Sequence, residues 1–333
     1  MTNTNDHITY MKRALELAEK GLGHVAPNPM VGCVIVHKGL IIGQGYHRQY
    51  GEAHAEVNAI HSVLDPSLLS ESTVYVTLEP CAHFGKTPPC AHLLIAKKVK
   101  HVVVAAQDPF PAVSGKGIQL LRDAGIEVTV GICEAEARFL NRRFLTSIEK
   151  KRPYVILKWA ESSDGFIDID RSTHQKGVFW ITELPAQQLV HLWRTQEPGI
   201  AIGGHTVIID NPQLTARHVI GAQPTRFVME GSQKIPADAA IFSGDSPTHV
   251  VPSSLRSPHE WLSFIHDKGI QSVIIEGGAR ILNAFIQSGL WDEARVFTGK
   301  NKIEKGLQAP TLSNRASDQC AIGNDLLSTY YNL

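Results

Sequence analysis

Apolar residues recur at two different spacings in the first half of the chain, and the two spacings alternate. Apolar positions between Ile8 and Leu22 follow the period of an α-helix, so an amphipathic helix is predicted there. Short β-rich runs follow, with helical patterns between them. The predicted strands are 31–36, 40–45, 73–78, 101–105 and 127–130, and the predicted helices are 7–22, 54–63, 89–98, 116–124 and 134–149. This alternation predicts a layered α/β domain with a largely parallel sheet.

A second α/β pattern begins after the charged segment 149–153, which ends in a proline and is the candidate linker. Strands are predicted at 154–158 and 199–202, with a helix at 184–196 and a strand–turn–helix unit around 272–278. A chain of 333 residues is long enough for two domains, and these are expected to span 1–150 and 151–333.

Composition and charge exclude several classes of protein. The chain is 43% hydrophobic and 19% charged, which is typical of a folded protein and not of a disordered one. Its 32 basic and 32 acidic residues balance, so a nucleic-acid partner is not expected. No apolar run is long enough for a membrane span or a signal peptide. Five cysteines in a chain of this length do not suggest a disulfide framework, and a cytoplasmic location is predicted.

One histidine and two cysteines carry the clearest chemical signal. They occur as His54-Ala-Glu56, Pro80-Cys81 and Cys90. An imidazole and two thiolates suit Zn²⁺ and leave a fourth position for water, whose pKa the metal lowers. His-x-Glu with a later Pro-Cys-x-x-Cys is the signature of zinc deaminases, although eight residues separate the cysteines here. Glu56 would then move protons without binding the metal. His54 and Cys81 are both expected to lie at the first residue of a helix.

Three other interpretations of this motif stay open. The three side chains could be ordinary buried residues, or they could form a closed structural zinc site with a fourth ligand such as His83. In the second case the chain would be a zinc module joined to a nucleotide-sensing domain, and Glu56→Gln would leave its function intact. The third is a nucleic-acid base deaminase with an appended recognition domain. The balanced charge and the long intercysteine segment count against it.

The second half contains phosphate-binding candidates but no dinucleotide fingerprint. No Gly-x-Gly-x-x-Gly follows a predicted strand, so a Rossmann site is not supported. Glu276-Gly-Gly278 ends an apolar strand and opens a helix, where backbone N–H groups could bind an anion. Gly203 and Gly204 begin a polar stretch that runs to Arg217. Glycine pairs at strand ends are more often turns than cofactor sites, so these residues alone do not establish phosphate binding.

Longer segments resemble a known family. The segments 27–32 (PNPMVG), 54–56, 80–90 (PCAHFGKTPPC) and 108–117 resemble the deaminase half of the RibD family of bifunctional riboflavin biosynthesis enzymes. The long intercysteine segment is what that family shows. In the second half, similarity to the family's reductase half is carried by 158–165, 180–182, His191, Arg194, Thr206, 210–217 and 276–278.

The resemblance implies a fold and a set of site residues. The fold is α/β, with a three-layer αβα cytidine-deaminase-like domain followed by a dihydrofolate-reductase-like α/β domain. His54, Cys81 and Cys90 would bind Zn²⁺, and Glu56 would be the proton shuttle. NADPH would be bound by Ala160, Trp180, Thr206, Asp210, Gly278, Ala279, Arg280, Ile281, Leu282, Asn283 and Ala284. The substrate would contact Asn28, Lys158, Val178, Arg194, Leu214, Arg217 and Glu276, and its phosphate could meet His83 and Lys86.

The implied substrate is a pyrimidine ribosyl phosphate, 2,5-diamino-6-(5-phospho-ribosylamino)pyrimidin-4-one. Its C2 amino group would be removed by hydrolysis, and NADPH would then reduce the ribosyl group to ribityl. Arg194 and Arg217 fit this reading physically, because guanidinium groups bind phosphate through paired hydrogen bonds. A pair of surface salt bridges is the alternative. We also expect a homo-oligomer.

This chain departs from the family pattern near the expected reductase site. Ser163 and Phe166 replace the usual leucine and basic residue of a Ser-Leu-Asp-Gly-basic sequence, and Val178 stands where a substrate-contacting serine is common. The segment 168–176 is longer and more polar than is typical. These differences affect the expected substrate contacts more than the NADPH site.

Overall fold

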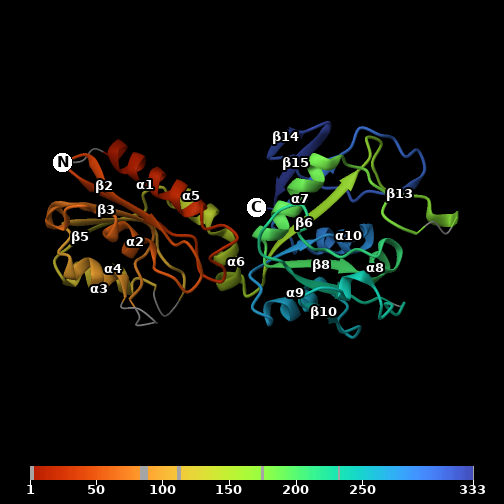
Figure 1. Ribbon diagram of the computed structural model, residues 1–333, viewed down its shortest axis with the longest axis horizontal. Helices are drawn as coiled ribbons and strands as arrows, with labels where there is room; N and C mark the ends of the chain where they lie inside the picture. Colours follow the sequence, from red (N-terminus) through yellow and green to blue (C-terminus); the bar gives the residue numbers. More distant parts are fainter. Residues whose placement is uncertain (1–3, 83–88, 111–113, 174–175, 232, 333) are drawn as a thin grey trace. The chain divides into compact units, whose positions relative to one another are not determined.

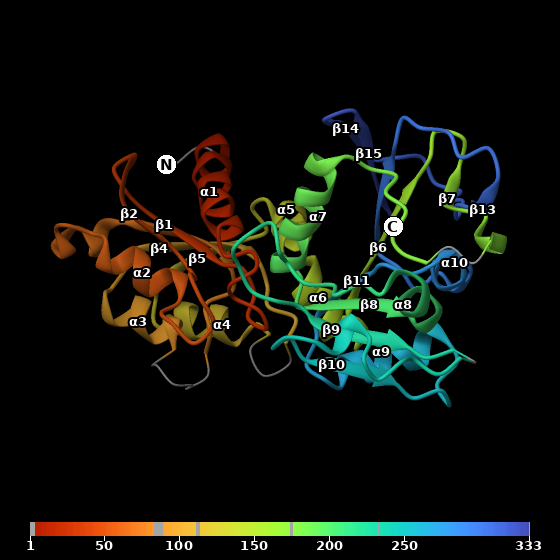
Figure 2. The same ribbon diagram turned by 45° about the vertical axis from the view of Figure 1, so that its right-hand side comes forward.

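Two mixed sheets organise the chain, one in each of two compact units, Met1–Lys150 and Lys151–Leu333. The computed structural model describes residues 4–82, 89–110, 114–173, 176–231 and 233–332. Figures 1 and 2 show the helices and strands of both units. The α/β class predicted for each half is confirmed.

The sheet of the first unit has, over the described residues, five strands in the order β2-β1-β3-β4-β5. Strands β3, β4 and β5 pair in parallel, whereas β1 pairs antiparallel with both β2 and β3. The expectation of a largely parallel sheet is therefore wrong for this unit. The turn Lys38-Gly39, whose two positive φ angles suit a tight hairpin, accounts for the antiparallel pairing of β1 with β2. The strands are β1 Gly32–His37, β2 Leu40–Tyr46, β3 Thr73–Leu78, β4 His101–Ala106 and β5 Glu127–Val130.

Helices cover both faces of this sheet, which makes three layers (Figure 1). Side chains alternate along each strand, so Val34 packs with α1 and α5 on one face and Ile35 with α2, α3 and α4 on the other. In β4 likewise, Val103 packs on the same face as Val34 and Val104 on the same face as Ile35. The helical elements are α1 Thr4–Glu19, α2 Ala55–His61, η1 Pro66–Glu71, α3 Cys90–Ala96, α4 Lys116–Asp123, α5 Glu134–Leu140 and α6 Arg142–Lys150.

The single helix predicted at 134–149 is two helices, α5 and α6, which meet at Asn141. The Asn141 side chain accepts a hydrogen bond from the Met30 N–H at 2.8 Å and donates one to the Met30 carbonyl at 2.9 Å. Asparagine has a low helix propensity because its side chain competes for backbone groups. Here it holds the segment before β1, two residues from Asn28.

The second unit is built on a sheet that has eight strands within the described ranges, in the order β10-β9-β8-β11-β6-β12-β15-β14. The pairings from β10 to β12 are parallel, and β15 and β14 add an antiparallel hairpin at one edge. A separate two-stranded sheet joins β7 to β13. The strands are β6 Tyr154–Glu161, β7 Phe166–Ile169, β8 Gly199–Gly203, β9 Thr225–Met229, β10 Thr248–Val251, β11 Ser272–Ile275, β12 Glu293–Thr298, β13 Gly306–Gln308, β14 Asp318–Ile322 and β15 Asp325–Tyr331.

Two hydrophobic cores lie on the two faces of this larger sheet. Leu157 and Ile275 pack with α9 and α10, while Ile156 and Ile274 pack with α7. Parallel strands buried on both faces read as continuous apolar runs, as β11 does. The helical elements are η2 Arg171–Thr173, α7 Leu184–Gln196, α8 Gly204–Asp210, η3 Ala240–Phe242, α9 Pro258–His266 and α10 Ala279–Ser288. Among the described residues, no helix is both long and apolar enough to cross a membrane.

Candidate active sites

The first candidate site lies where β3 ends and where two helices begin. His54 is the residue before α2, in extended conformation, and Cys90 is the first residue of α3. Cys81 does not open a helix, contrary to expectation, but lies in the loop after β3. That loop is fixed by two hydrogen bonds: Ala91 N–H donates to the Cys81 carbonyl and Cys90 N–H donates to Cys81 Sγ, both at 3.2 Å.

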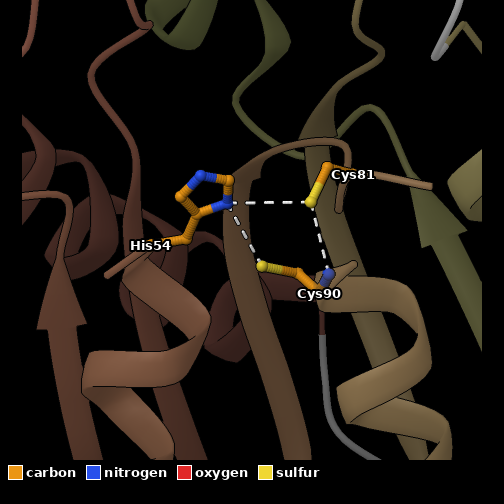
Figure 3. A group of neighbouring side chains, drawn as sticks. All are labelled: His54, Cys81 and Cys90. Atoms are coloured by element: carbon orange, nitrogen blue, oxygen red, sulfur yellow. Dashed lines mark hydrogen bonds between the residues drawn. The ribbon is translucent and has the colours of Figure 1, made fainter. Parts of the chain in front are cut away.

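The spacing of the three side chains matches a tetrahedral zinc ion. His54 Nδ1 is 3.6 Å from Cys81 Sγ and 3.4 Å from Cys90 Sγ, and all three atoms lie within 4.8 Å of one another. Zinc bonds of about 2.0–2.1 Å to nitrogen and about 2.3 Å to sulfur, at tetrahedral angles, place N and S about 3.5 Å apart. Figure 3 shows the imidazole turned so that Nδ1 faces both sulfurs. The donor set therefore fits Zn²⁺ in both type and distance.

The two thiols respond differently to this environment. A hydrogen bond with Cys90 lowers the pKa of Cys81, whereas the interaction with Cys81 and burial raise the pKa of Cys90. The hydrogen bond with Cys81 also raises the pKa of His54. The protonation of each of the three groups thus depends on its neighbours. A bound cation would displace protons from the ligand atoms, because zinc ligands bind in their deprotonated forms.

Glu56 lies in the first turn of α2 and is 3% exposed. Burial raises the pKa of its carboxyl to about 7, and the neighbouring Cys81 adds to the shift. Within the described chain the ligand group contains His54, Cys81 and Cys90, and Glu56 is not a member of it. A carboxyl that can gain or lose a proton near neutral pH suits a general acid–base role.

Asn28 lies beside this site through a second histidine, His47. The Asn28 amide nitrogen donates to His47 Nε2 at 3.1 Å, since His47 Nδ1 donates to the Ala53 carbonyl at 3.1 Å. The His47 ring meets the His54 ring edge-on at 5.4 Å, and burial lowers its pKa. The sequence prediction missed His47, because no metal or catalytic spacing connects it to His54. His83 and Lys86, named above as a fourth ligand and as phosphate contacts, lie outside the described residues.

The second candidate site is a cavity of about 570 Å³ at the carboxyl ends of β6, β8 and β11. Ligands bind at this end of parallel strands in open α/β sheets. Ten of the predicted residues line the cavity: Lys158, Ala160, Val178, Trp180, Arg194, Thr206, Asp210, Leu214, Arg217 and Glu276. Predicted cofactor and substrate residues thus share one cavity, as hydride transfer between two bound molecules requires.

The remaining predicted cofactor residues are not among those that line the cavity. They belong to the segment 278–284, at and after the start of α10. Leu282 is fully buried in the hydrophobic core and Ala279 is 6% exposed, so neither presents a side chain to a ligand. Gly278 comes closest to the site, since a Cβ added there would lie 3.3 Å from Thr206 Oγ1.

A buried ion pair lies at the centre of the second site. Arg194 Nη2 is 2.9 Å from Glu276 Oε2, and both side chains are about nine-tenths buried. Burial alone would raise the pKa of Glu276, but Arg194 and Lys158 outweigh it and hold that pKa at about 2. Burial lowers the pKa of Lys158. Arg194 Nη1 also donates to the Thr215 carbonyl, so three of its five N–H groups are engaged within the protein. The expected paired phosphate contact can therefore use only its two other N–H groups.

The segment 211–217 follows α8 with an unusual backbone. Asn211 and Leu214 have positive φ angles of 44° and 53°. This strain is held in place by the fully buried Arg226, which donates to the Gln213 carbonyl at 3.1 Å, and by Gln223, which bonds both backbone groups of Ala216. The segment carries Leu214 and Arg217 into the cavity lining.

His191 and Gln187 line the same cavity, although no role was predicted for either. His191 lies three residues before Arg194 in α7, and Gln187 lies seven residues before it. Residues at these spacings share one face of a helix. Helical spacing from Arg194 was therefore a signal that could have found them.

Two different family models match separate parts of the chain. Residues 4–106 match the family model of the cytidine and deoxycytidylate deaminase zinc-binding region, and residues 153–299 match that of the RibD C-terminal domain. The match to the RibD C-terminal domain favours neither a zinc module joined to a nucleotide-sensing domain nor a nucleic-acid base deaminase with an appended recognition domain.

Similarity extends over nearly the full length. The riboflavin biosynthesis protein RibD of Aquifex aeolicus is 38% identical over 334 residues, covering 93% of this chain and 91% of that protein. The Escherichia coli RibD protein is 36% identical over 322 residues, covering 86% of each. The crystal structure of a Thermotoga maritima diaminohydroxyphosphoribosylaminopyrimidine deaminase/5-amino-6-(5-phosphoribosylamino)uracil reductase is 34% identical, with a TM-score of 0.87 over 98% of each chain. The chain therefore belongs to the RibD family of riboflavin biosynthesis enzymes, which join a deaminase to a reductase.

Proposed function

We propose that the unit Met1–Lys150 deaminates 2,5-diamino-6-(5-phospho-ribosylamino)pyrimidin-4-one and that the unit Lys151–Leu333 reduces the ribosyl group of the product with NADPH. The observation that carries the first half is the N···S spacing of 3.4 and 3.6 Å at His54, Cys81 and Cys90. The second half rests on the shared cavity and on the cationic side chains that line it, Lys158, Arg194 and Arg217.

In the deaminase, His54, Cys81 and Cys90 would hold Zn²⁺ and Glu56 would move protons. Zinc, when bound, makes a water molecule acidic enough to act as a nucleophile near neutral pH. The Glu56 carboxyl oxygen would take a proton from the water and deliver it to a nitrogen of the ring. The same carboxyl would then take the second proton of the water, from the oxygen now bonded to C2, and deliver it to the departing amino group. One water is consumed, the C2–N bond breaks, a C2–O bond forms and ammonia leaves.

In the reductase, the residues of the cavity would bind and orient two molecules. NADPH, when bound, supplies a hydride for C1 of the ribosyl group. Ala160, Trp180, Thr206 and Asp210 would line its site, with the turn at Gly278 beside Thr206. In the segment 278–284, the N–H groups of Ala279 and Arg280 at the start of α10 are the backbone donors that could bond to NADPH, because the N–H groups of Ile281 and Leu282 already bond to the Gly278 carbonyl.

The cationic groups of the cavity suit the substrate phosphate. Arg217 and the two uncommitted N–H groups of Arg194 would bind it, and Lys158 adds positive charge. Glu276 stays ionised at neutral pH and orients Arg194, so its role toward the phosphate is indirect. Leu214 and Val178 would contact the substrate through apolar surface, and Asn28 would contact the pyrimidine in the deaminase. A homo-oligomeric state and a cytoplasmic location stay predictions.

Incubation of the pyrimidine phosphate with the protein, with and without NADPH, tests both halves separately. Ammonia release should not require NADPH, and NADPH oxidation should follow ammonia release in time. Ammonia without any NADPH oxidation would contradict the reductase half. NADPH oxidation without ammonia would contradict the deaminase half and the order of the two steps.

A further inference from the structure

Glu79, the residue after β3, has a carboxylate that accepts four backbone hydrogen bonds. Its side chain is almost fully buried, and Glu79 is 4% exposed. Oε2 accepts from the N–H groups of Asp108 at 3.2 Å and Gly115 at 2.9 Å. Oε1 accepts from Gly117 at 2.9 Å and Ile118 at 3.2 Å. One side chain therefore joins the end of β3 to the loop after β4 and to the first turn of α4.

The close approach of these segments depends on a glycine. A Cβ added at Gly117 would lie 1.9 Å from the Pro80 carbonyl oxygen and 3.3 Å from Glu79 Oε1. No other amino acid fits there unless Pro80 moves. The Glu79 N–H also donates to the Ala106 carbonyl at 3.0 Å. Glu79 and Pro80 lie directly before Cys81. They are held by the four hydrogen bonds to the Glu79 carboxylate, by the hydrogen bond to Ala106 and by the close contact with Gly117.

We propose that Glu79 is a positioning residue of the zinc site, which holds Cys81 at the distance from His54 that the metal requires. This inference rests on the proposed function of the first unit. Cys81 is held on its other side by Ala91 and Cys90. Without the Glu79 carboxylate, the segment before Cys81 would lose its four hydrogen bonds to the loop after β4 and to the start of α4. Only the bonds from Cys90 and Ala91 would then fix Cys81, and the distance from His54 Nδ1 to Cys81 Sγ would be less well set.

Substitution by glutamine separates the hydrogen bonds from side-chain volume. Glutamine has nearly the shape of glutamate, but its NH₂ group would face two of the four backbone donors instead of accepting from them. Residues that support metal ligands through hydrogen bonds typically change metal affinity by about 10–100-fold when substituted. We expect Glu79→Gln to lower zinc affinity by about that factor.

Zinc affinity is measured on the full-length holoenzyme by competition with a chromogenic chelator. Glu71→Gln is the matched control, since Glu71 lies just before β3, with its side chain exposed 3.8 Å from Lys38. Reductase activity on the deaminated substrate reports the intact second unit in every variant. The proposal predicts weaker zinc binding and a lower deaminase kcat in Glu79→Gln alone, with reductase activity unchanged. A melting temperature that falls while zinc affinity stays within about twofold of wild type would overturn it.

Two further variants keep the test decisive if Glu79→Gln does not fold. Glu79→Asp keeps the charge but shortens the side chain, so it cannot reach all four donors and should weaken zinc binding by several-fold. Gly117→Ala leaves Glu79 intact but pushes Pro80 away, and the same loss is expected. Wild-type zinc affinity in both variants would contradict the proposal. A wild-type protein that binds no zinc would instead contradict the proposed function, so the two failures are distinguishable.

Discussion

The backbone N–H of Arg217 donates a hydrogen bond of 2.7 Å to Nδ1 of His191, which lies 26 residues earlier in α7. Nδ1 can accept this bond only when it carries no proton. Burial is the largest cause that lowers the pKa of His191 to about 4, and the positive charges of Arg194 and Arg217 contribute to the same shift. His191 is therefore neutral at physiological pH and fixes the segment that presents Arg217 to the cavity.

The contribution of His191 to the stability of the second unit should be lost as the pH decreases from about 6.5 to about 4. Between these values the unfolded chain binds a proton at His191 that the folded chain does not, so protonation favours unfolding. Tryptophan fluorescence follows this unit selectively, because all five tryptophans belong to it: Trp159, Trp180, Trp193, Trp261 and Trp291. His191→Gln, which can accept the same bond but does not titrate, should flatten this pH dependence. An equally steep decline in the variant would show that another group is responsible.

Removal of one partner of the Arg194–Glu276 pair should strongly destabilise the second unit. Arg194→Met leaves the Glu276 carboxylate buried without its nearest positive charge, and breaking such a pair costs about 3–5 kcal/mol. The double variant Arg194→Met, Glu276→Gln should lose less than the sum of the two single variants. Urea unfolding followed by tryptophan fluorescence measures all three. The exposed pair Lys300–Glu183 provides the control, and Lys300→Met should change the unfolding free energy little. Additive losses at Arg194 and Glu276 would show that the two groups are not coupled.

Removal of zinc should separate the two activities. A chelator-treated protein should release no ammonia but should still oxidise NADPH with the deaminated substrate, since the predicted metal ligands all lie in the first unit. Added Zn²⁺ should restore ammonia release. Parallel loss of both activities would contradict the assignment of the metal to the deaminase alone.

NADPH should quench the fluorescence of Trp180. This side chain is 57% exposed and lines the cavity, whereas Trp159 beside it is 4% exposed. Trp180→Phe should remove most of the quenching and raise the Kd for NADPH by about 2- to 12-fold, the equivalent of about 0.5–1.5 kcal/mol of aromatic stacking. Unchanged quenching in the variant would place the cofactor away from Trp180.

Local apolar patterns predict the first unit well because its strands carry few charges. β3 and β5 begin and end at the predicted residues. In the second unit β9 and β12 were not predicted. β9 contains the fully buried Arg226, and β12 contains the buried pair Glu293 and Arg295. Charged residues inside a strand hide its apolar pattern, even where, as for Glu293 and Arg295, they pair within the strand.

The zinc ligands were predictable because their residue types and order form a motif. The contacts that hold the surrounding segments in place were not predictable. Nothing in the local sequence connects Glu79 to Gly117, or Asn141 to Met30, since these contacts arise only when distant segments pack together. The cavity residues of the second unit were found through family resemblance. The physical pattern alone singled out Glu276-Gly277-Gly278 and the polar stretch that runs from Gly203 to Arg217.

The most direct test of the account is Glu56→Gln in the full-length protein. The variant should retain zinc and should still oxidise NADPH with the deaminated substrate, because Glu56 is outside the ligand group and in the other unit. Ammonia release from the pyrimidine phosphate should fall by about 10²–10⁴-fold, the usual contribution of a general acid–base. Ammonia release at the wild-type rate, with zinc bound, would contradict the central claim that Glu56 moves the protons of the deamination.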